Sequence, residues 1–319
     1  MQELVKALAR GGQQPPRPIF MPLIFAAAAK VAGLSPQQFY TNPTKIANGL
    51  RQLQGPLRCD ALVCYADQTL IAEALGAGVE WETGLPQITS PPLQLTPVEV
   101  TTLGRVPIML EVVHRLRIVL RGRVALAVAL PGLFTTVKYL TDPSATDGPS
   151  SVADSLAAAG GATLQAARAV CEAGADLILL VEAEPPPADN PVRSQWLAMI
   201  ETICNVTRFH EALPVLLTIR RGVGEWPEIA AQGAIPCLPA AELAQLPETE
   251  SLPEGPYGLA LPVTGPSSLP AETVLRLQNQ NCILITTAGN IPYEIEAKEL
   301  RPLVANLRQA VRASGKLTG

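Results

Sequence analysis

Histidine and aromatic side chains are scarce in this chain of 319 residues, which has two histidines and 4% Phe, Trp and Tyr together. His210 ends a predicted helix, where a cation complements the helix dipole, and His114 lies within another helix. Neither is placed as a catalytic base or metal ligand, which argues against a Ser-His-Asp triad and a histidine-rich metal site. Hydrophobic residues make up 48% of the chain, and because few of them are aromatic, we expect Leu, Val, Ile and Ala to fill the core.

An excess of positive charge is also missing. The net charge of −4 and the pI near 5.4 argue against a nucleic-acid partner, because phosphate binding needs a basic face. No run of about 18 apolar residues is present, so we expect no membrane span. The first residues, MQELVKALARGG, contain Glu3 and no continuous apolar stretch. They do not resemble a secretory signal, and we expect a cytoplasmic protein.

Short motifs for nucleotides, metals and disulfides are absent as well. No GxGxxG follows a predicted strand, and no GxxxxGK[ST] occurs. The six cysteines include no CxxC pair and lie mostly in apolar runs, so we expect reduced, buried thiols. They are Cys59, Cys64, Cys171, Cys204, Cys237 and Cys282.

Short apolar runs alternate with helical patterns along the whole chain. The apolar runs are nearly continuous, which is typical of parallel strands covered by helices. The eight predicted strands are Pro18–Leu23, Ala61–Tyr65, Val124–Leu130, Asp176–Glu182, Pro214–Ile219, Ala234–Leu238, Tyr257–Val263 and Cys282–Thr286. The predicted helices are Pro43–Gln54, Gln68–Leu75, Pro107–Leu120, Val152–Ala173, Val192–His210, Gly224–Gln232, Ala271–Asn279 and Lys298–Ala313.

Eight βα units at this length predict a single-domain (β/α)8 TIM barrel over residues 18–319, with an open doubly wound sheet as the alternative. Residues 1–17 are predicted to form an N-terminal extension that packs on the barrel. Active sites of such barrels lie at the C-terminal ends of the strands. The candidate residues there are Asp67 and Tyr139 as catalytic residues, and Glu182, Thr218, Arg220, Arg221 and Asn290 as substrate-binding residues.

Each of these candidates also has a structural interpretation. Asp67 follows a strand and precedes a helix, so it is expected both as a helix cap and as a buried acid that orients or protonates a substrate. Arg220 and Arg221 either face water or bind a carboxylate or phosphate. Glu182 either pairs with these arginines or faces water, and Tyr139 is either a core residue or a catalytic one.

Several segments resemble those of the uroporphyrinogen decarboxylase superfamily and its methylcobamide:coenzyme M methyltransferase branch. RPIFMPLIFAAAAKVAGLSPQQFYTNPTKIA resembles the opening of these methyltransferases, including the F-Y-x-[DN]-P segment at Phe39–Pro43. DALVCYADQTLIAEALGAGVEW is similar to the run shared by the decarboxylases and methyltransferases. LPGLFTTVKYL, EAGADLILLVEA and ITTAGNIPYEIEAKELRPLVANLRQAV resemble later segments. The resemblance extends from about Arg17 to Val311 and implies the same barrel.

The chain departs from both branches at their functional residues. The methyltransferases carry an H-x-C motif and a later Cys that bind zinc, and these positions hold Thr218, Arg220 and Gly289 here. No zinc is therefore expected at the family position. We also expect no covalently bound cofactor, although a corrinoid is a possible partner cofactor. The decarboxylases begin with an arginine-rich stretch, where this chain has LIFAAAAK. Asp67 and Tyr139 match the decarboxylases' aspartate and tyrosine, and the late histidine falls at Gly289.

Three functions follow from the resemblance. The first is a zinc-independent methyltransferase-like enzyme that works with a corrinoid or related tetrapyrrole, which implies a small-molecule or corrinoid-protein partner. The second is a tetrapyrrole carboxy-lyase that uses Asp67. The third is a non-catalytic ligand-binding barrel. Related barrels often form homodimers, which the resemblance leaves open for this chain.

Overall fold

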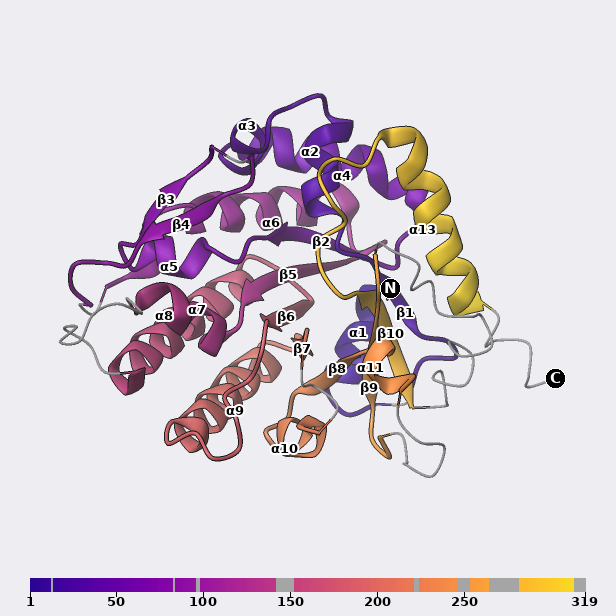
Figure 1. Cartoon of the computed structure of the whole chain (residues 1–319). Helices are drawn as coiled ribbons and strands as arrows, with labels where there is room; N and C mark the ends of the chain where they lie inside the picture. The colour runs from indigo at the N-terminus through magenta and orange to yellow at the C-terminus, as the bar shows by residue number, and fades with distance from the viewer. Residues whose placement is uncertain are drawn as a thin grey trace.

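Eight parallel strands form one nearly closed barrel (Figure 1). The computed structural model describes residues 1–12, 14–82, 84–95, 98–141, 152–220, 224–245, 253–263 and 281–312. The strands follow the order β1-β10-β9-β8-β7-β6-β5-β2 around the barrel, which confirms the predicted single-domain (β/α)8 fold. Their bounds are β1 Ile19–Met21, β2 Ala61–Ala66, β5 Ala125–Pro131, β6 Leu177–Glu182, β7 Leu213–Thr218, β8 Ile235–Pro239, β9 Tyr257–Leu261 and β10 Cys282–Thr287.

Helices in the connections between the strands surround the barrel, as Figure 1 shows in a view along the barrel axis. The predicted helix Ala271–Asn279 lies outside the described residues. None of the helices in the described ranges is long and apolar enough to cross a lipid bilayer. The helices are α1 Gln2–Ala9, α2 Phe25–Val31, α3 Pro36–Tyr40, α4 Pro43–Leu57, α5 Leu70–Ala74, α6 Val106–Leu120, α7 Leu133–Leu140, α8 Val152–Glu172, α9 Arg193–Phe209, α10 Trp226–Ala231, α11 Ala240–Leu243 and α13 Ala297–Arg312, with a 3-10 turn at Val100–Thr102.

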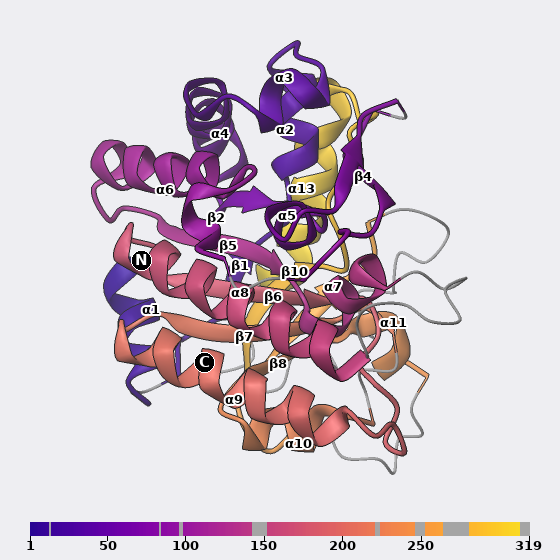
Figure 2. The same cartoon turned by 90° about the vertical axis from the view of Figure 1, so that its left-hand side faces the viewer.

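The two ends of the barrel differ in what covers them. In Figure 2 helix α1 lies at the left-hand end of the strands, whereas α7 and α11 lie at the right-hand, C-terminal end. Helix α1 packs on β5 and β7 with its apolar face, of which Val5 is fully buried. The N-terminal end is therefore closed by the chain itself. The C-terminal end, which we call the mouth, carries the loops in which barrel enzymes place their active sites.

Between β1 and β2 a single residue, Asp60, joins the strands through its backbone and its side chain in place of a regular ladder. The Asp60 N–H donates to the Phe20 carbonyl oxygen at 2.9 Å, and Asp60 Oδ2 accepts from the Phe20 N–H at 3.0 Å. Arg17 donates two hydrogen bonds to the same carboxylate, at 2.6 and 2.9 Å. Burial raises the pKa of Asp60, but Arg17 and the Phe20 N–H outweigh it and hold the pKa below its usual value. We call this group the seam.

A second aspartate repeats this arrangement at the start of β6. The Asp176 N–H donates to the Leu126 carbonyl at 2.7 Å, while Asp176 Oδ2 accepts from the Leu126 N–H at 2.8 Å. Arg117 pairs with the carboxylate at 2.6 Å. Both aspartates lie at the N-terminal ends of strands, and residues at that end of a barrel contribute to stability rather than to catalysis.

A small hairpin outside the barrel is not predicted by the sequence. Strand β3, Gly78–Glu80, pairs antiparallel with β4, Gln87–Ser90. Both strands are short and mostly exposed, so they lack the apolar runs that marked the eight barrel strands.

The six cysteines are free and buried, as expected from their apolar surroundings. Burial raises the pKa of the Cys59, Cys171 and Cys204 thiols to about 12, so these three are thiols rather than thiolates at neutral pH.

Candidate functional site

Asp67 lies at the mouth, directly after β2, and its carboxylate is engaged by protein groups. Its side chain is 1% exposed. Oδ1 accepts hydrogen bonds from the Thr69 N–H and hydroxyl, each at 2.8 Å, and Oδ2 accepts from Arg105. The predicted helix-cap role is not realised, because α5 begins at Leu70 with Thr69 as its N-cap and no side-chain cap; Asp67 instead closes a turn with Thr69, two residues on. The buried ion pair with Arg105 adds a partner that sequence reasoning missed.

Arg105 connects three parts of the mouth. Besides Asp67, its guanidinium donates to Glu73 Oε2 at 2.7 Å and to the Thr69 hydroxyl at 2.8 Å. It also lies 4.9 Å from the ring centroid of Trp81, at the end of β3, a distance typical of a cation–π contact. The arginine side chain is only 4% exposed. Arg105 therefore fixes the Asp67 carboxylate between β2, α5 and the hairpin.

Glu182, at the end of β6, binds the N-terminus of α7. Its carboxylate accepts from the Phe134 N–H at 2.9 Å, the Thr135 N–H at 2.6 Å and the Trp196 indole at 3.2 Å, and also from the Thr135 hydroxyl. A carboxylate at a helix N-terminus is favoured by the helix dipole. These bonds, rather than the predicted pairing with Arg220, account for its position. Complete burial nevertheless raises its pKa to about 7.

Gly132 allows this close approach. A Cβ at Gly132 would lie 2.6 Å from Cδ of Glu182 and 2.7 Å from its Cα. No larger residue fits at this position without moving β6 or α7, so the glycine before α7 is needed for the carboxylate to reach the helix.

Strand register separates two threonines at the mouth. Thr218 pairs with Glu182, so both side chains lie on the same face of the sheet, which Glu182 directs toward Trp196 in α9. Across four neighbouring strands, Leu284 is paired in one row with Gly258, Cys237 and Leu217. Thr286 lies two residues after Leu284 in the same strand, so its side chain points to the same face as this row. Leu217 pairs with Val181, next to Glu182, so this row lies on the opposite face, toward the barrel axis. Thr286 thus points inward, and Thr218 toward the helices.

Several buried polar atoms in the described part of the mouth have no hydrogen-bond partner. They are Thr286 Oγ1, Asn290 Oδ1 and Thr218 Oγ1. The Asn290 amide nitrogen donates to the carbonyl of Ala66, the residue before Asp67, at 3.5 Å. Asn290 therefore lies beside the end of β2, on the same side of the mouth as Asp67. Since buried polar atoms nearly always have partners, the free oxygens indicate groups that a bound molecule or water would satisfy.

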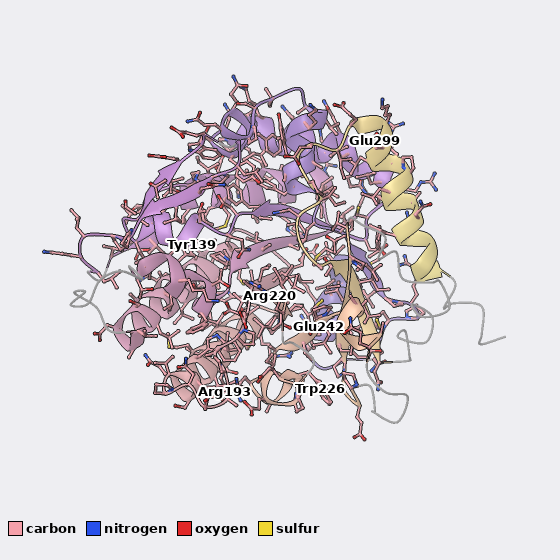
Figure 3. All side chains as sticks on the ribbon, in the orientation of Figure 1. Tyr139, Arg193, Arg220, Trp226, Glu242 and Glu299 are labelled. Carbon is pink, nitrogen blue, oxygen red and sulfur yellow. The ribbon has the colours of Figure 1, made fainter. Side chains whose placement is uncertain are left out.

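Tyr139 and Arg220 complete the predicted set, and Arg221 lies outside the described residues. Tyr139 is half-buried in α7, where burial and the charge of Asp67 raise its pKa. Arg220 is exposed and, among the described residues, forms no ion pair. In the axial view of Figure 3, Arg220 lies near the centre and Tyr139 toward the hairpin side. Glu184 lies 3.9 Å from Lys138.

The residues at the end of β7 do not fit a zinc ion. Arg220 is a cation, and a Thr218 hydroxyl facing the helices does not replace the Cys or His ligands that zinc prefers. Within the described ranges, no group of three or more His, Cys, Asp and Glu side chains is arranged to hold a metal.

Comparison with known proteins agrees with this barrel. A methyltransferase from Methanosarcina mazei has a TM-score of 0.70 at 18% identity, and the alignment covers 97% of each chain. A B12-independent methionine synthase from Shewanella sp. W3-18-1 has a TM-score of 0.54 at 14% identity, over 86% of this chain and 87% of the other. At these identities the likeness concerns the fold alone.

Sequence comparison gives the family. No curated protein matches the chain. Residues 1–186 match the family described as Uroporphyrinogen decarboxylase (URO-D), and they hold the Asp67, Arg105 and Glu182 groups. That match covers more than half of the sequence. The chain therefore belongs to the uroporphyrinogen decarboxylase (URO-D) family.

Proposed function

We propose that this chain is a methyltransferase-like enzyme that works without zinc and binds a corrinoid or a related tetrapyrrole at the mouth of its barrel. The observation that carries the proposal is the pair of buried, unpartnered oxygens of Thr286 and Asn290 at the mouth, where the Asp67–Arg105 ion pair also lies. Family membership and the methyltransferase-like fold support the choice of reaction.

The residues of the mouth take different roles in this proposal. Thr286 and Asn290 hydrogen-bond the polar part of the substrate. Arg220, together with Arg221, binds its anionic end, because a guanidinium group pairs well with carboxylate or phosphate. Asp67 orients the substrate through the fixed Arg105 network rather than as a free base, because both of its oxygens are already hydrogen-bonded.

The reaction moves a methyl group from the donor to a nucleophile. The bond between the methyl carbon and the donor breaks, its electron pair stays with the donor, and a new bond forms between the methyl carbon and the acceptor. The acceptor loses a proton in the process. Glu182 does not take this proton, because its buried carboxylate faces α7 and Trp196 rather than the barrel axis, so the proton passes to solvent at the mouth. Tyr139, with its raised pKa, remains a hydrogen-bond donor.

Binding by matched variants tests the substrate site. Thr286→Val removes one unpartnered hydroxyl at the mouth, and Thr163→Val removes an equally buried, unpartnered hydroxyl in α8. We expect Thr286→Val to weaken binding of methylcobalamin or coproporphyrinogen by about tenfold, the effect of one lost hydrogen bond of about 1.4 kcal/mol. Thr163→Val should leave binding unchanged. Equal binding by both variants would refute a substrate role for Thr286.

Thr218 is tested in the same titration. The sequence predicts that it binds substrate, whereas the strand register directs it toward the helices. A loss of affinity in Thr218→Val would support the substrate role, and unchanged affinity would assign its hydroxyl to the layer between strands and helices.

Metal content and turnover separate the remaining functions. We expect purified protein to carry less than one zinc per chain and to transfer methyl groups from a methylated corrinoid to a thiol or to tetrahydrofolate. Stoichiometric zinc would contradict the zinc-free mechanism. Tight binding without methyl transfer would instead favour the non-catalytic binding barrel.

The second candidate is a tetrapyrrole carboxy-lyase, which the URO-D match of residues 1–186 favours. Asp67 lies in that part of the chain and would face the substrate from the end of β2. This function predicts release of CO2 from a porphyrinogen, and the release should vanish in Asp67→Asn. Absence of CO2 from several porphyrinogens would remove this candidate.

A further inference from the structure

Three arginines line a cavity on the outside of the barrel, beside the C-terminal end of α4, which leads into the start of β2 rather than into the mouth. The cavity lies between the C-terminal end of α4 and the face of α13 that packs against it, and its volume is about 210 Å³. Its lining holds Arg58, Arg301 and Arg308 but no carboxylate. The remaining lining residues are Pro56, Leu57, Val304 and Ala305.

The spacing on α13 directs two of these arginines to the same place. Arg301, Val304, Ala305 and Arg308 follow the i, i+3, i+4, i+7 pattern of one helix face. Val304 is fully buried against α4, and the small Ala305 leaves room beside it. The two arginines lie two helical turns apart, about 10 Å along the axis, and both line the cavity.

Arg58 approaches from the opposite side. It ends α4 in the left-handed conformation, with φ of 50°, and is exposed. A cation at a helix C-terminus complements the helix dipole, which accounts for Arg58 alone. It does not account for Arg301, which reaches the same cavity from a different helix. Among the described residues, neither Arg58 nor Arg301 forms an ion pair.

Arg308 connects the cavity to the seam. Its charge is one of the influences that hold the pKa of Asp60 low, after the larger effects of burial, which raises it, and of Arg17, which lowers it. Arg17 pairs with the same carboxylate through two hydrogen bonds.

We propose that the cavity between α4 and α13 binds a small anion with two linked phosphate groups. Guanidinium groups suit phosphate because their N–H groups form paired hydrogen bonds with its oxygens. Arg58 and Arg301 reach the cavity from two different helices, and two separated guanidinium groups suit an anion whose charge is spread over two groups better than a single small ion. A volume of about 210 Å³ lies below the range of about 300–1,000 Å³ usual for drug-sized ligands, so a tetrapyrrole does not fit.

Binding to the full-length protein tests this site, with inorganic diphosphate, ADP, inorganic phosphate and citrate as probes in a calorimetric titration at low salt. We expect diphosphate to bind saturably and more tightly than phosphate or citrate. Binding of ADP as well would identify the ligand as the diphosphate group of a nucleotide, and binding of diphosphate alone would identify the free anion. Tighter binding of citrate, or no saturable binding, would overturn the proposal.

Matched variants locate the binding. Arg301→Gln and Arg58→Gly should each weaken diphosphate binding by at least about tenfold, the loss of a charge-assisted hydrogen-bond pair. Glycine accepts the left-handed conformation at position 58 without strain, so this variant keeps the fold. Arg121→Gly is the control, because Arg121 ends α6 with φ of 48° and is also exposed. An equal loss in Arg121→Gly, or full binding by Arg301→Gln, would refute the site.

Discussion

Replacement of Arg105 by methionine is expected to destabilise this protein more than any exposed arginine replacement. Arg105 is the partner of Asp67, and the two side chains are 4% and 1% exposed. Arg105→Met leaves the Asp67 carboxylate buried with no opposite charge beside it. Methionine keeps much of the apolar contact with Trp81, so the change isolates the loss of charge.

The magnitude follows from the burial of each partner. Removal of one member of a buried ion pair costs about 3–5 kcal/mol of unfolding free energy. Loss of the Arg105–Glu73 ion pair adds little to this cost, because the Glu73 side chain is 23% exposed and water screens its charge. Asp67→Asn should cost only about 1–2 kcal/mol, since the amide oxygen still accepts from Thr69 and Arg105 still pairs with Glu73.

Chemical denaturation measures these differences, with Arg115→Met as the control. Arg115 pairs with Glu111 on the exposed face of α6, where such a pair contributes about 0.5 kcal/mol or less. The double variant Arg105→Met/Asp67→Asn should be more stable than Arg105→Met alone, because it buries no unpaired charge. A cost for Arg105→Met within about 1 kcal/mol of the control, or a double variant less stable than the single one, would refute this reasoning.

Further predictions concern α7 and the seam. Gly132→Ala should destabilise the protein by roughly 1–3 kcal/mol in denaturation, because its Cβ would meet Glu182, whereas Gly161→Ala, in open space within α8, should be neutral or stabilising. The raised pKa of Glu182 means that the folded chain holds a proton that the unfolded chain releases above about pH 4.5. Its stabilising contribution is therefore complete below that pH and is lost as the pH rises through about 7, by about 3 kcal/mol in total; Glu182→Gln should remove this slope from stability measured against pH. Asp60→Asn, which weakens the pair with Arg17 at the seam, should lower stability by about 1–3 kcal/mol, and an unchanged denaturation midpoint would contradict that role.

The sequence predicts the barrel well because its strands are marked locally. Each of the eight apolar runs corresponds to a strand, and the ends differ by one or two residues, as at Leu213, which begins β7 one residue before the predicted start. The hairpin of β3 and β4 was missed because GVE and QITS have neither the length nor the apolar character of the other strands.

The sequence predicts which candidate residues lie at the strand ends, but not which side chains they pair with. Asp67 was expected at the end of a strand because it follows an apolar run, and it lies there; the Asn290 amide donates to the carbonyl of the preceding residue, Ala66. Arg105 was missed because it is 38 residues from Asp67, and nothing in the sequence around it marks an arginine that folds inward. Contacts between distant segments depend on how α5, α6 and the hairpin pack, which local patterns do not contain.

The order of the strands has a consequence for how the chain is made. Strand β1 is the first barrel strand to leave the ribosome, yet its ladder is formed with β10, the last one. Until β10 emerges, the nascent chain holds an open sheet whose β1 edge presents unpaired backbone groups, a surface prone to association with other chains. The seam at Asp60 and Arg17 is available much earlier, since it needs only β1 and the residues before β2. It therefore offers the growing chain a temporary anchor for β1, and a seam variant should aggregate more during synthesis than during refolding of the complete chain.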